Sequence, residues 1–129
     1  MITFKQGRVD AEQVVELLRA SGMNRPVDDM NRIRRMLAGA DLILTAWDAD
    51  RLIGLVRALS DFSWATYISE VAVHPDYQRK GIGRELLERV FATSSEARYV
   101  LHSVEGVDGF YERLGFVPLV NVYMKPRTR

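Results

Sequence analysis

The chain has 129 residues, of which 47% are hydrophobic and 27% are charged, proportions typical of one globular domain. It contains no cysteine, which excludes disulfide frameworks, cysteine-based zinc sites and a thiolate nucleophile. The 18 Lys and Arg residues and 17 Asp and Glu residues leave a formal net charge of +1. That balance argues against nonspecific nucleic-acid binding through a domain-wide basic field.

No apolar run approaches the ~20 residues that span a bilayer, and the N-terminal residues lack the apolar stretch of a signal peptide. Internal repeats and low-complexity tracts are also absent from the sequence. We therefore expect a cytoplasmic protein that forms one domain over residues 1–129 and binds neither a membrane nor nucleic acid.

The first third of the chain predicts a short strand and two helices. An apolar start at residues 2–4 precedes a run with apolar residues at helical spacing, where Asp10 and Gln13 resemble a helix-capping pair. A second apolar stripe at helical spacing covers residues 30–37 and ends before Gly39, a residue type that often terminates helices.

The middle of the chain changes to short β-rich runs, which cover residues 42–47, 52–59 and 64–73. Polar turns separate these runs, so they predict three consecutive antiparallel strands. The dipeptide His74-Pro75 ends the third strand, because proline cannot donate to a sheet ladder.

The last third alternates between helical and β patterns. It predicts a helix over residues 82–91, a strand over 98–102, a helix over 108–114 and a last strand over 116–124. The predicted order is β-α-α-β-β-β-α-β-α-β. A meander followed by a β-α-β crossover implies an α/β (α+β) domain with a mixed, mostly antiparallel central sheet flanked by helices.

The most informative segment is the glycine-bearing loop between the third meander strand and the next helix. Its residues 78–84 read Gln-Arg-Lys-Gly-Ile-Gly-Arg. Two glycines at a helix start leave backbone N–H groups accessible, and Arg79, Lys80 and Arg84 add positive charge, which favours a pyrophosphate. The alternative is that the two glycines only cap the helix and let it pack closely on the sheet.

Two common phosphate motifs do not fit this loop. The nucleotide P-loop, G-x-x-x-x-G-K-[ST], does not occur in the chain. The dinucleotide fingerprint G-x-G-x-x-G would need a third glycine where the chain has Leu86, and also an N-terminal β-α-β unit.

Two motifs in the second half of the chain resemble those of the GNAT superfamily of N-acetyltransferases. Gln78-Arg79-Lys80-Gly81-Ile82-Gly83 matches the family signature Q/R-x-x-G-x-G/A, and Val71-Ala72-Val73-His74-Pro75 is similar to the strand before it. Phe110-Tyr111-Glu112-Arg113-Leu114-Gly115-Phe116 resembles the family's F-Y-x-x-x-G-F segment. The motifs lie in the family's order, and the predicted elements cover nearly the whole chain as a GNAT domain would.

The resemblance implies acetyl-coenzyme A as cosubstrate and direct transfer of its acetyl group to a primary amine. The pyrophosphate would lie on the glycine loop, and the pantetheine arm would run along the preceding strand like an added strand. The cofactor-binding residues implied in this way are Val71, Val73, Gln78, Arg79, Lys80, Gly81, Ile82, Gly83 and Arg84. No cluster of histidines and carboxylates suggests a metal.

The resemblance also implies Tyr111 as the acid that donates a proton to the coenzyme A sulfur. A tyrosine whose hydroxyl rests on a backbone carbonyl is the alternative. Glu70 on the third meander strand is the candidate catalytic base, although pairing with an arginine such as Arg57 explains it about as well. Strand alternation predicts that Glu70 shares a face with Ala72 and that Tyr67 lies on the other face.

One segment departs from the family's pattern. Many members carry an asparagine shortly before the F-Y segment that contacts the coenzyme, whereas residues 103–107 of this chain read Ser-Val-Glu-Gly-Val. Ser103 could substitute for that contact.

The acceptor, a small-molecule or peptide amine, is expected between the two N-terminal helices, the turn at residues 60–64 and a C-terminal hairpin. Side chains available there are Trp47, Arg57, Asp61, Phe62, Trp64 and Tyr67. Asp61 could hold a cationic acceptor, and the alternative is a turn aspartate that binds its own backbone.

Two further alternatives follow from the same residues. A non-catalytic acyl-coenzyme A binding or sensing module is the rival to an enzyme. The last predicted strand, over residues 116–124, could form a sheet edge and so mediate a homodimer.

Overall fold

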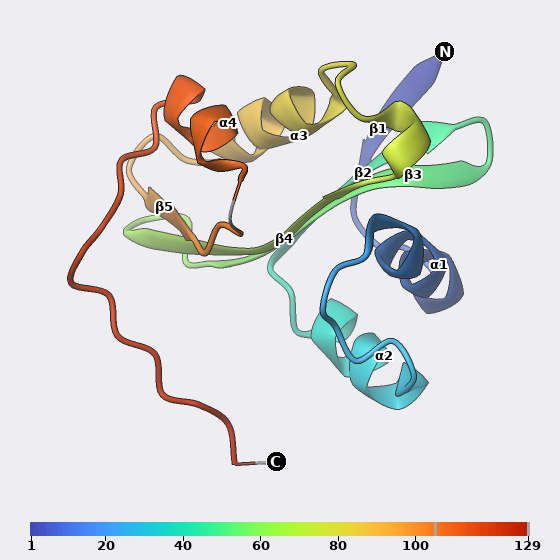
Figure 1. Ribbon diagram of the computed structural model, residues 1–129, viewed down its shortest axis with the longest axis horizontal. Coiled ribbons are helices and arrows are strands. Elements are labelled where there is room, and N and C mark those ends of the chain that lie inside the picture. Colours follow the sequence, from blue (N-terminus) through green and yellow to red (C-terminus); the bar gives the residue numbers. More distant parts are fainter. Residues whose placement is uncertain (105, 129) are drawn as a thin grey trace.

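The computed structural model describes residues 1–104 and 106–128. Figure 1 shows the elements, which are β1 Ile2–Gln6, α1 Ala11–Ser21, α2 Met30–Ala38, β2 Leu42–Asp48, β3 Arg51–Ser60, β4 Ala65–Val73, the 3-10 helix η1 Pro75–Tyr77, α3 Ile82–Phe91, β5 Arg98–Leu101 and α4 Asp108–Arg113.

The strands form one sheet in the order β1-β2-β3-β4-β5. Strands β1 to β4 pair antiparallel with their neighbours in sequence, whereas β5 runs parallel to β4. A parallel pair needs a crossover connection, and α3 supplies it. The predicted mixed, mostly antiparallel sheet flanked by helices is therefore confirmed.

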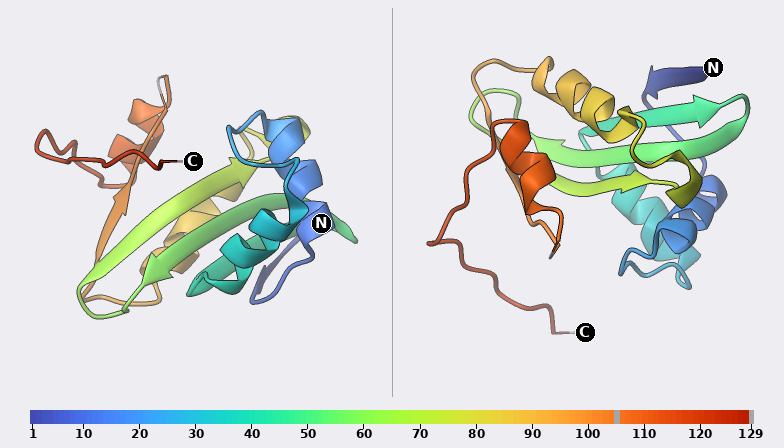
Figure 2. Two further views of the ribbon diagram at one scale, coloured as in Figure 1. Left: turned by 90° about the horizontal axis from the view of Figure 1, so that it is seen from below. Right: turned by 45° about the horizontal axis from the view of Figure 1, so that its top comes forward.

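Helices cover both faces of this twisted sheet (Figures 1 and 2). On the face of α1 and α2, the core contains Val14, Leu17, Leu18, Ile33, Ile43, Leu55 and Ala72. On the face of α3 and α4, it contains Leu44, Val56, Ile68, Leu86, Leu87 and Val90. None of the described helices is long and apolar enough to cross a membrane.

The C-terminal end of α1 agrees with its local sequence, whereas the N-terminal end lacks the predicted capping pair. Gly22 ends α1 in a left-handed conformation with φ 72°, as helix C-caps often do. Asp10 is the N-cap residue, but its side chain makes no capping hydrogen bond. Gln13 Nε2 donates instead to the carbonyl of Asp50, so the predicted capping pair was wrong.

A β-bulge interrupts the pairing of β3 with β4. Arg57 pairs with Glu70, whereas the next residue of β3 pairs with Ile68, so Ser69 is the extra residue. One extra residue reverses the alternation of side chains along the strand. Tyr67 therefore lies on the same face of the sheet as Glu70, and the prediction of opposite faces was wrong.

The predicted last strand over residues 116–124 was also wrong. Residues 117–128 adopt neither helix nor strand and form an extended arm that leaves the body of the molecule (Figure 1). The arm has the β propensity of a strand. A strand forms only where a neighbouring edge accepts its hydrogen bonds, and the arm pairs with no edge in the described part of its own chain.

Candidate functional site

The sheet opens between β4 and β5 just before the glycine loop. Their parallel pairing begins at Ala65 and ends at Ile68, next to the bulge at Ser69. Residues 70–73 of β4 have no strand partner on that side within the described ranges. The bulge therefore marks the point where an unpaired edge begins inside the sheet.

The backbone of this edge is arranged to receive an extended ligand. The N–H of His74 donates to the carbonyl of Ile53 on β3. In the alternating pattern of an antiparallel pair, Val71 and Val73 then direct their N–H and C=O groups away from β3, toward the opening. The Val71 groups and the Val73 N–H can pair with an amide-bearing chain as a missing strand would, whereas the Val73 carbonyl accepts from Gln78 Nε2.

The glycine loop brings unpaired N–H groups to the end of the same edge. Arg79 and Gly81 adopt left-handed conformations with φ 63° and 79°, and Gly81 is the N-cap of α3. The N–H of Glu85 closes the first helical turn on the carbonyl of Gly81. The N–H groups of residues 82–84 precede that bond and have no intrahelical carbonyl, which is the arrangement that binds phosphate oxygens.

Two side chains hold the loop against the sheet. Gln78 Nε2 donates to the carbonyl of Val73 at 3.1 Å. The Tyr77 hydroxyl donates to Asp48 on β2, and this hydrogen bond raises the pKa of Tyr77 above its usual range. Tyr77 and Asp48 are positioning residues that the sequence analysis missed, since a contact over 29 positions leaves no local signal.

Three basic side chains surround the start of α3, as the sequence predicts. Arg79 and Lys80 are exposed, and Lys80 Nζ lies 5.7 Å from the centre of the Tyr77 ring. Arg84 pairs with Glu88 at 2.9 Å, and its side chain is 65% exposed. An exposed pair of this kind contributes little free energy, so Arg84 can exchange Glu88 for a phosphate at low cost.

Gly83 lies where α3, β4 and α4 meet. A Cβ atom added there would lie 3.4 Å from Phe110 Cζ and 3.7 Å from Val73 Cγ2. These are ordinary contacts, so a methyl group fits, whereas a longer side chain would crowd Phe110 and Val73. This position agrees with the interpretation of close packing.

Tyr111 lies on α4 in an aromatic cluster. Its ring centre is 5.1 Å from that of Phe110 and 5.7 Å from that of Phe116. Burial in this apolar surrounding raises the pKa of the Tyr111 phenol. Its hydroxyl has no hydrogen-bond partner among the residues that the structure describes, so the alternative of a hydroxyl held by a carbonyl is not observed.

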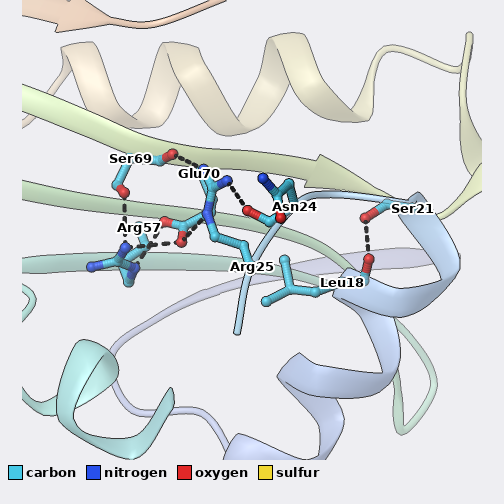
Figure 3. Close-up of polar contacts among 7 residues, drawn as sticks. All are labelled: Leu18, Ser21, Asn24, Arg25, Arg57, Ser69 and Glu70. Carbon is cyan, nitrogen blue, oxygen red and sulfur yellow. Dashed lines mark hydrogen bonds and ion pairs between the residues drawn. The ribbon is translucent and has the colours of Figure 1, made fainter. Parts of the chain in front are cut away.

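Glu70 lies beside the bulge with 2% of its surface exposed. Arg57 on β3 contacts both carboxylate oxygens, with 2.8 Å from Nη2 to Oε1 and 2.8 Å from Nε to Oε2 (Figure 3). The second contact is an ion pair without hydrogen-bond geometry. Arg25, from the connection between α1 and α2, adds a hydrogen bond of 3.0 Å from Nε to Oε1. The expected pairing of Glu70 with Arg57 is confirmed, and Arg25 was missed.

The same two arginines hold the bulged residue. Arg25 Nη2 donates to the Ser69 carbonyl at 2.7 Å, and Arg57 Nη2 donates to Ser69 Oγ at 2.8 Å (Figure 3). We call Arg25, Arg57, Ser69 and Glu70 the bulge cluster. Because pairing of β4 with β5 ends at the bulge, this cluster fixes the geometry that leaves the edge of β4 unpaired.

The residues expected around the acceptor do not gather in one place. Trp47 pairs with Leu52 at the start of β3, which lies roughly 25 Å along the strand from the turn after Ser60. Phe62, Trp64 and Tyr67 are exposed at 39%, 66% and 44% near that turn. Trp47 therefore cannot share a small-molecule pocket with these three aromatic side chains.

Asp61 closes the turn between β3 and β4. Its Oδ1 accepts the backbone N–H groups of Ser63, Trp64 and Ala65 at 2.8–3.1 Å. These three hydrogen bonds lower the pKa of Asp61 to about 2. The alternative role of Asp61, a turn residue bound to its own backbone, is the one observed.

The segment that departs from the family's asparagine pattern precedes α4. Ser103 is partly buried and Glu105 lies outside the described residues. Within residues 1–104 and 106–128, no three His, Asp or Glu side chains form a group that could hold a metal ion.

The sequence matches the Acetyltransferase (GNAT) domain over residues 39–118, more than half of the chain. The chain belongs to this GNAT family. The matched region contains β4, the glycine loop and α4, so the family assignment rests on the same segment that forms the opening in the sheet.

Curated relatives named as N-acetyltransferases match between half and nine tenths of the chain. The chain is 32% identical over 121 residues to the uncharacterized N-acetyltransferase ycf52-like of Prochlorococcus marinus, covering 88% of this chain and 66% of that protein. It is 36% identical over 72 residues to the uncharacterized N-acetyltransferase ycf52 of Gracilaria tenuistipitata var. liui, covering 51% and 38%. The chain therefore spans less than two thirds of the length of these relatives.

Two solved structures match nearly the whole chain. A GNAT family acetyltransferase from Streptococcus pneumoniae TIGR4 has a TM-score of 0.85 and 29% identity, with 100% of this chain and 99% of that chain covered. A probable acetyltransferase from methicillin-resistant Staphylococcus aureus also has a TM-score of 0.85, with 98% and 100% covered. Its identity of 24% supports the fold alone.

Proposed function

We propose that the chain, as one domain over residues 1–129, is an N-acetyltransferase that uses acetyl-coenzyme A and a primary amine. The observation that carries the proposal is the opening between β4 and β5, where the Val71 backbone and the Val73 N–H, which have no strand partner on that side, lead to the N–H groups of residues 82–84. Coenzyme A combines an amide-bearing arm with a pyrophosphate. The edge of β4 suits the arm, and the N–H groups of residues 82–84 suit the pyrophosphate.

In the proposed reaction, the amine nitrogen attacks the thioester carbonyl carbon directly, a C–N bond forms and the C–S bond breaks. An N–H group of the β4 edge polarises the carbonyl oxygen. Tyr111 donates its proton to the departing sulfur, and solvent then reprotonates the phenolate. The raised pKa keeps this phenol protonated at neutral pH. The amine loses its own proton to solvent.

Within this proposal Glu70 is a positioning residue, in place of the base that the sequence suggested. A general base needs a lone pair directed at the proton that it takes. Both Glu70 oxygens contact guanidinium nitrogens of Arg25 or Arg57 instead. Its contribution is to hold the bulge, and with it the open edge of β4.

The proposal is tested by thermal unfolding with acetyl-coenzyme A, followed by thiol release over a panel of small-molecule and peptide amines. We expect saturable stabilisation, about 2.7 kcal/mol at a ligand concentration 100 times Kd, and thiol release with at least one amine. Gly83→Gln should abolish the stabilisation. Gly22→Asn is the matched control, because Gly22 has φ 72° with open space around it and asparagine tolerates that conformation.

Two outcomes would contradict different parts of the proposal. If Gly83→Gln binds coenzyme A as tightly as the unmodified chain, the assigned phosphate site is wrong. Saturable binding without thiol release from any amine would favour a non-catalytic acyl-coenzyme A binding module. The observation that favours this second function is that Arg25 and Arg57 contact Glu70, the residue that was the candidate base.

A further inference from the structure

Strand β3 leaves the cover of helices α1 and α2 at Arg57. Leu55, Arg57 and Leu59 alternate onto the face of these helices, and they are 1%, 8% and 42% exposed. Tyr67 of β4 pairs with Leu59 and is 44% exposed on the same face. The helices therefore cover this face as far as Arg57, and beyond it Leu59 and Tyr67 form an uncovered surface that we call the apolar floor.

Arg57 has a free nitrogen at the border of this floor. Its Nε and Nη2 contact Glu70, and Nη2 also donates to Ser69 Oγ. Nη1 makes no hydrogen bond in the described part of the chain, and Figure 3 shows one nitrogen of this guanidinium directed away from the bulge cluster. Glu70 Oε2 is the one buried side-chain polar atom without a hydrogen bond among residues 1–104 and 106–128, so Nη1 is accessible to solvent. It can therefore donate to an oxygen of a ligand.

The second arginine of the bulge cluster has no such nitrogen. Arg25 donates from Nε to Glu70, from Nη1 to the carbonyl of Asn24 and from Nη2 to the carbonyl of Ser69. Two guanidinium groups against one carboxylate leave one positive charge of the cluster unbalanced. At the border of a buried region, where water screens charge less, that excess favours a ligand with a single negative charge.

The free nitrogen lies beside the opening of the sheet. Arg57 pairs with Glu70, and the next residue of β4 is Val71 on the unpaired edge. Phe110 and Tyr111 pack on the face of α3, so an amine can approach the opening from the face of Arg57. The enclosed cavity that Arg57 lines beneath α2 has a volume of about 10 Å³, room for one water, so an acceptor would lie over the apolar floor instead.

We propose, on the basis of the proposed function, that the acceptor is an apolar amino acid. Its carboxylate binds Arg57 Nη1, its side chain lies on Leu59 and Tyr67, and its amine is directed toward the opening at Val71. The single carboxylate matches the one unbalanced positive charge. Asp61, the residue that could have held a cationic acceptor, is occupied by its own turn.

The test compares acceptors that differ in one group. Thiol release from acetyl-coenzyme A is measured with phenylalanine, with phenylalaninamide, which lacks the negative charge, and with glycine, which lacks the apolar side chain. We expect kcat/KM for phenylalanine to exceed that for phenylalaninamide by about tenfold or more, because a charge-assisted hydrogen bond is lost. It should also exceed that for glycine. The amide contains more free amine at neutral pH, so amine basicity by itself favours the opposite order. An equal or higher kcat/KM for the amide overturns the proposal.

Two variants assign the preference to one side chain. The ratio of kcat/KM for phenylalanine to that for phenylalaninamide is taken within each variant, so a smaller folded fraction cancels. Arg57→Gln should abolish the preference. Arg25→Gln is the matched control, because it removes a cation from the same cluster but no free nitrogen; it should lower turnover and keep most of the ratio. Equal loss of the ratio in both variants overturns the role of Arg57. The comparison of acceptors in the unmodified chain remains decisive where a variant fails to fold.

Equilibrium binding distinguishes this proposal from the proposed function. Arginine Nε–H signals are followed by NMR with coenzyme A present. Phenylalanine should shift the signal that is missing from Arg57→Gln, and phenylalaninamide should not. If that shift occurs and no amine releases thiol, the proposed transfer is wrong and the carboxylate site is supported. Thiol release from other amines, without a shift of the Arg57 signal by phenylalanine, overturns the carboxylate site and leaves the proposed transfer supported.

Discussion

Two tyrosines that pack on the same side of the sheet have opposite environments. The Tyr99 hydroxyl donates to the carbonyl of Ser94 at 2.6 Å and lies 3.3 Å from that of Phe91. The Tyr111 hydroxyl is in an apolar cluster without a partner in the described chain. A partly buried polar group without a partner carries a desolvation cost, which a bound ligand can offset.

Substitution of each hydroxyl separates the structural tyrosine from the proposed acid. Tyr111→Phe should lower kcat about a hundredfold, at the low end for a general acid, and leave the coenzyme A Kd and Tm unchanged. Tyr99→Phe should leave kcat unchanged and lower the free energy of unfolding by roughly 1 kcal/mol, because it loses a hydrogen bond. Steady-state kinetics and thermal melts check both outcomes.

The pKa of Tyr111 adds a pH criterion to the same measurement. A phenol acts as an acid only below its pKa, and burial raises that pKa above its ordinary value. In the unmodified chain, kcat/KM should therefore not fall on the alkaline side up to about pH 10. Equal turnover of Tyr111→Phe and the unmodified chain would remove the assigned role.

At the scale of the elements, the bulge cluster connects a helical loop to the opening of the sheet. Arg25 lies between α1 and α2, whereas Ser69 and Glu70 lie on β4. A buried carboxylate with two guanidinium groups is costly to disturb from one side only, because the remaining charges lose their partner. The cluster thus makes the shape of β4 dependent on the loop between the first two helices.

Removal of the Glu70 carboxylate should therefore affect both stability and binding. Glu70→Ala should lower the free energy of unfolding by about 3–5 kcal/mol and weaken coenzyme A binding. Glu12→Ala is the matched control, since the Glu12–Arg34 pair has side chains 57% and 53% exposed. Its loss should cost less than about 1 kcal/mol and leave binding unchanged. Denaturant titration and calorimetry measure the two quantities.

A milder variant distinguishes positioning from base catalysis. Glu70→Gln keeps the shape of the side chain and removes its charge. If Glu70 only positions the bulge, the pH profile of kcat/KM should keep its form while KM for acetyl-coenzyme A rises. If Glu70→Gln instead lost the acidic limb of that profile, Glu70 would be the general base.

Across the whole molecule, positive and negative charges nearly cancel in number but are unevenly distributed in space. The formal net charge is +1, yet Arg79, Lys80 and Arg84 lie together at the start of α3. Screening limits exposed charges to a range of about 10 Å at 0.1 M salt, so a pyrophosphate responds to this local group and not to the total. Basic residues on α2 lie across the sheet from it (Figure 1).

This distribution predicts a local salt effect on binding. The coenzyme A Kd should rise severalfold between about 0.05 and about 0.5 M salt. Arg79→Gln should weaken binding at low salt and reduce that dependence, whereas Arg35→Gln on α2 should change neither. Titration calorimetry at several salt concentrations checks this. An equal effect of the two substitutions would mean that the total charge governs binding.

Local features of the chain could be predicted from its sequence. The helix over residues 82–91, its glycine start and the end of β4 before His74 appear as expected, because apolar spacing, glycine conformation and proline act between near neighbours. The order of elements from the first strand to α4 was correct for the same reason. The composition of the phosphate loop, and hence the chemistry that it can bind, was also evident in the sequence.

Features that join distant segments were decided only by the tertiary structure. Arg25, in the loop between α1 and α2, is 45 positions from its partner Glu70. The sequence indicates only that a buried carboxylate needs some cation beside it. The bulge at Ser69 depends on the pairing of two strands and reversed the face of Tyr67. The C-terminal segment has the propensity of a strand, but a strand also needs an edge. Propensity is a property of the sequence, whereas an available edge is a property of the folded molecule.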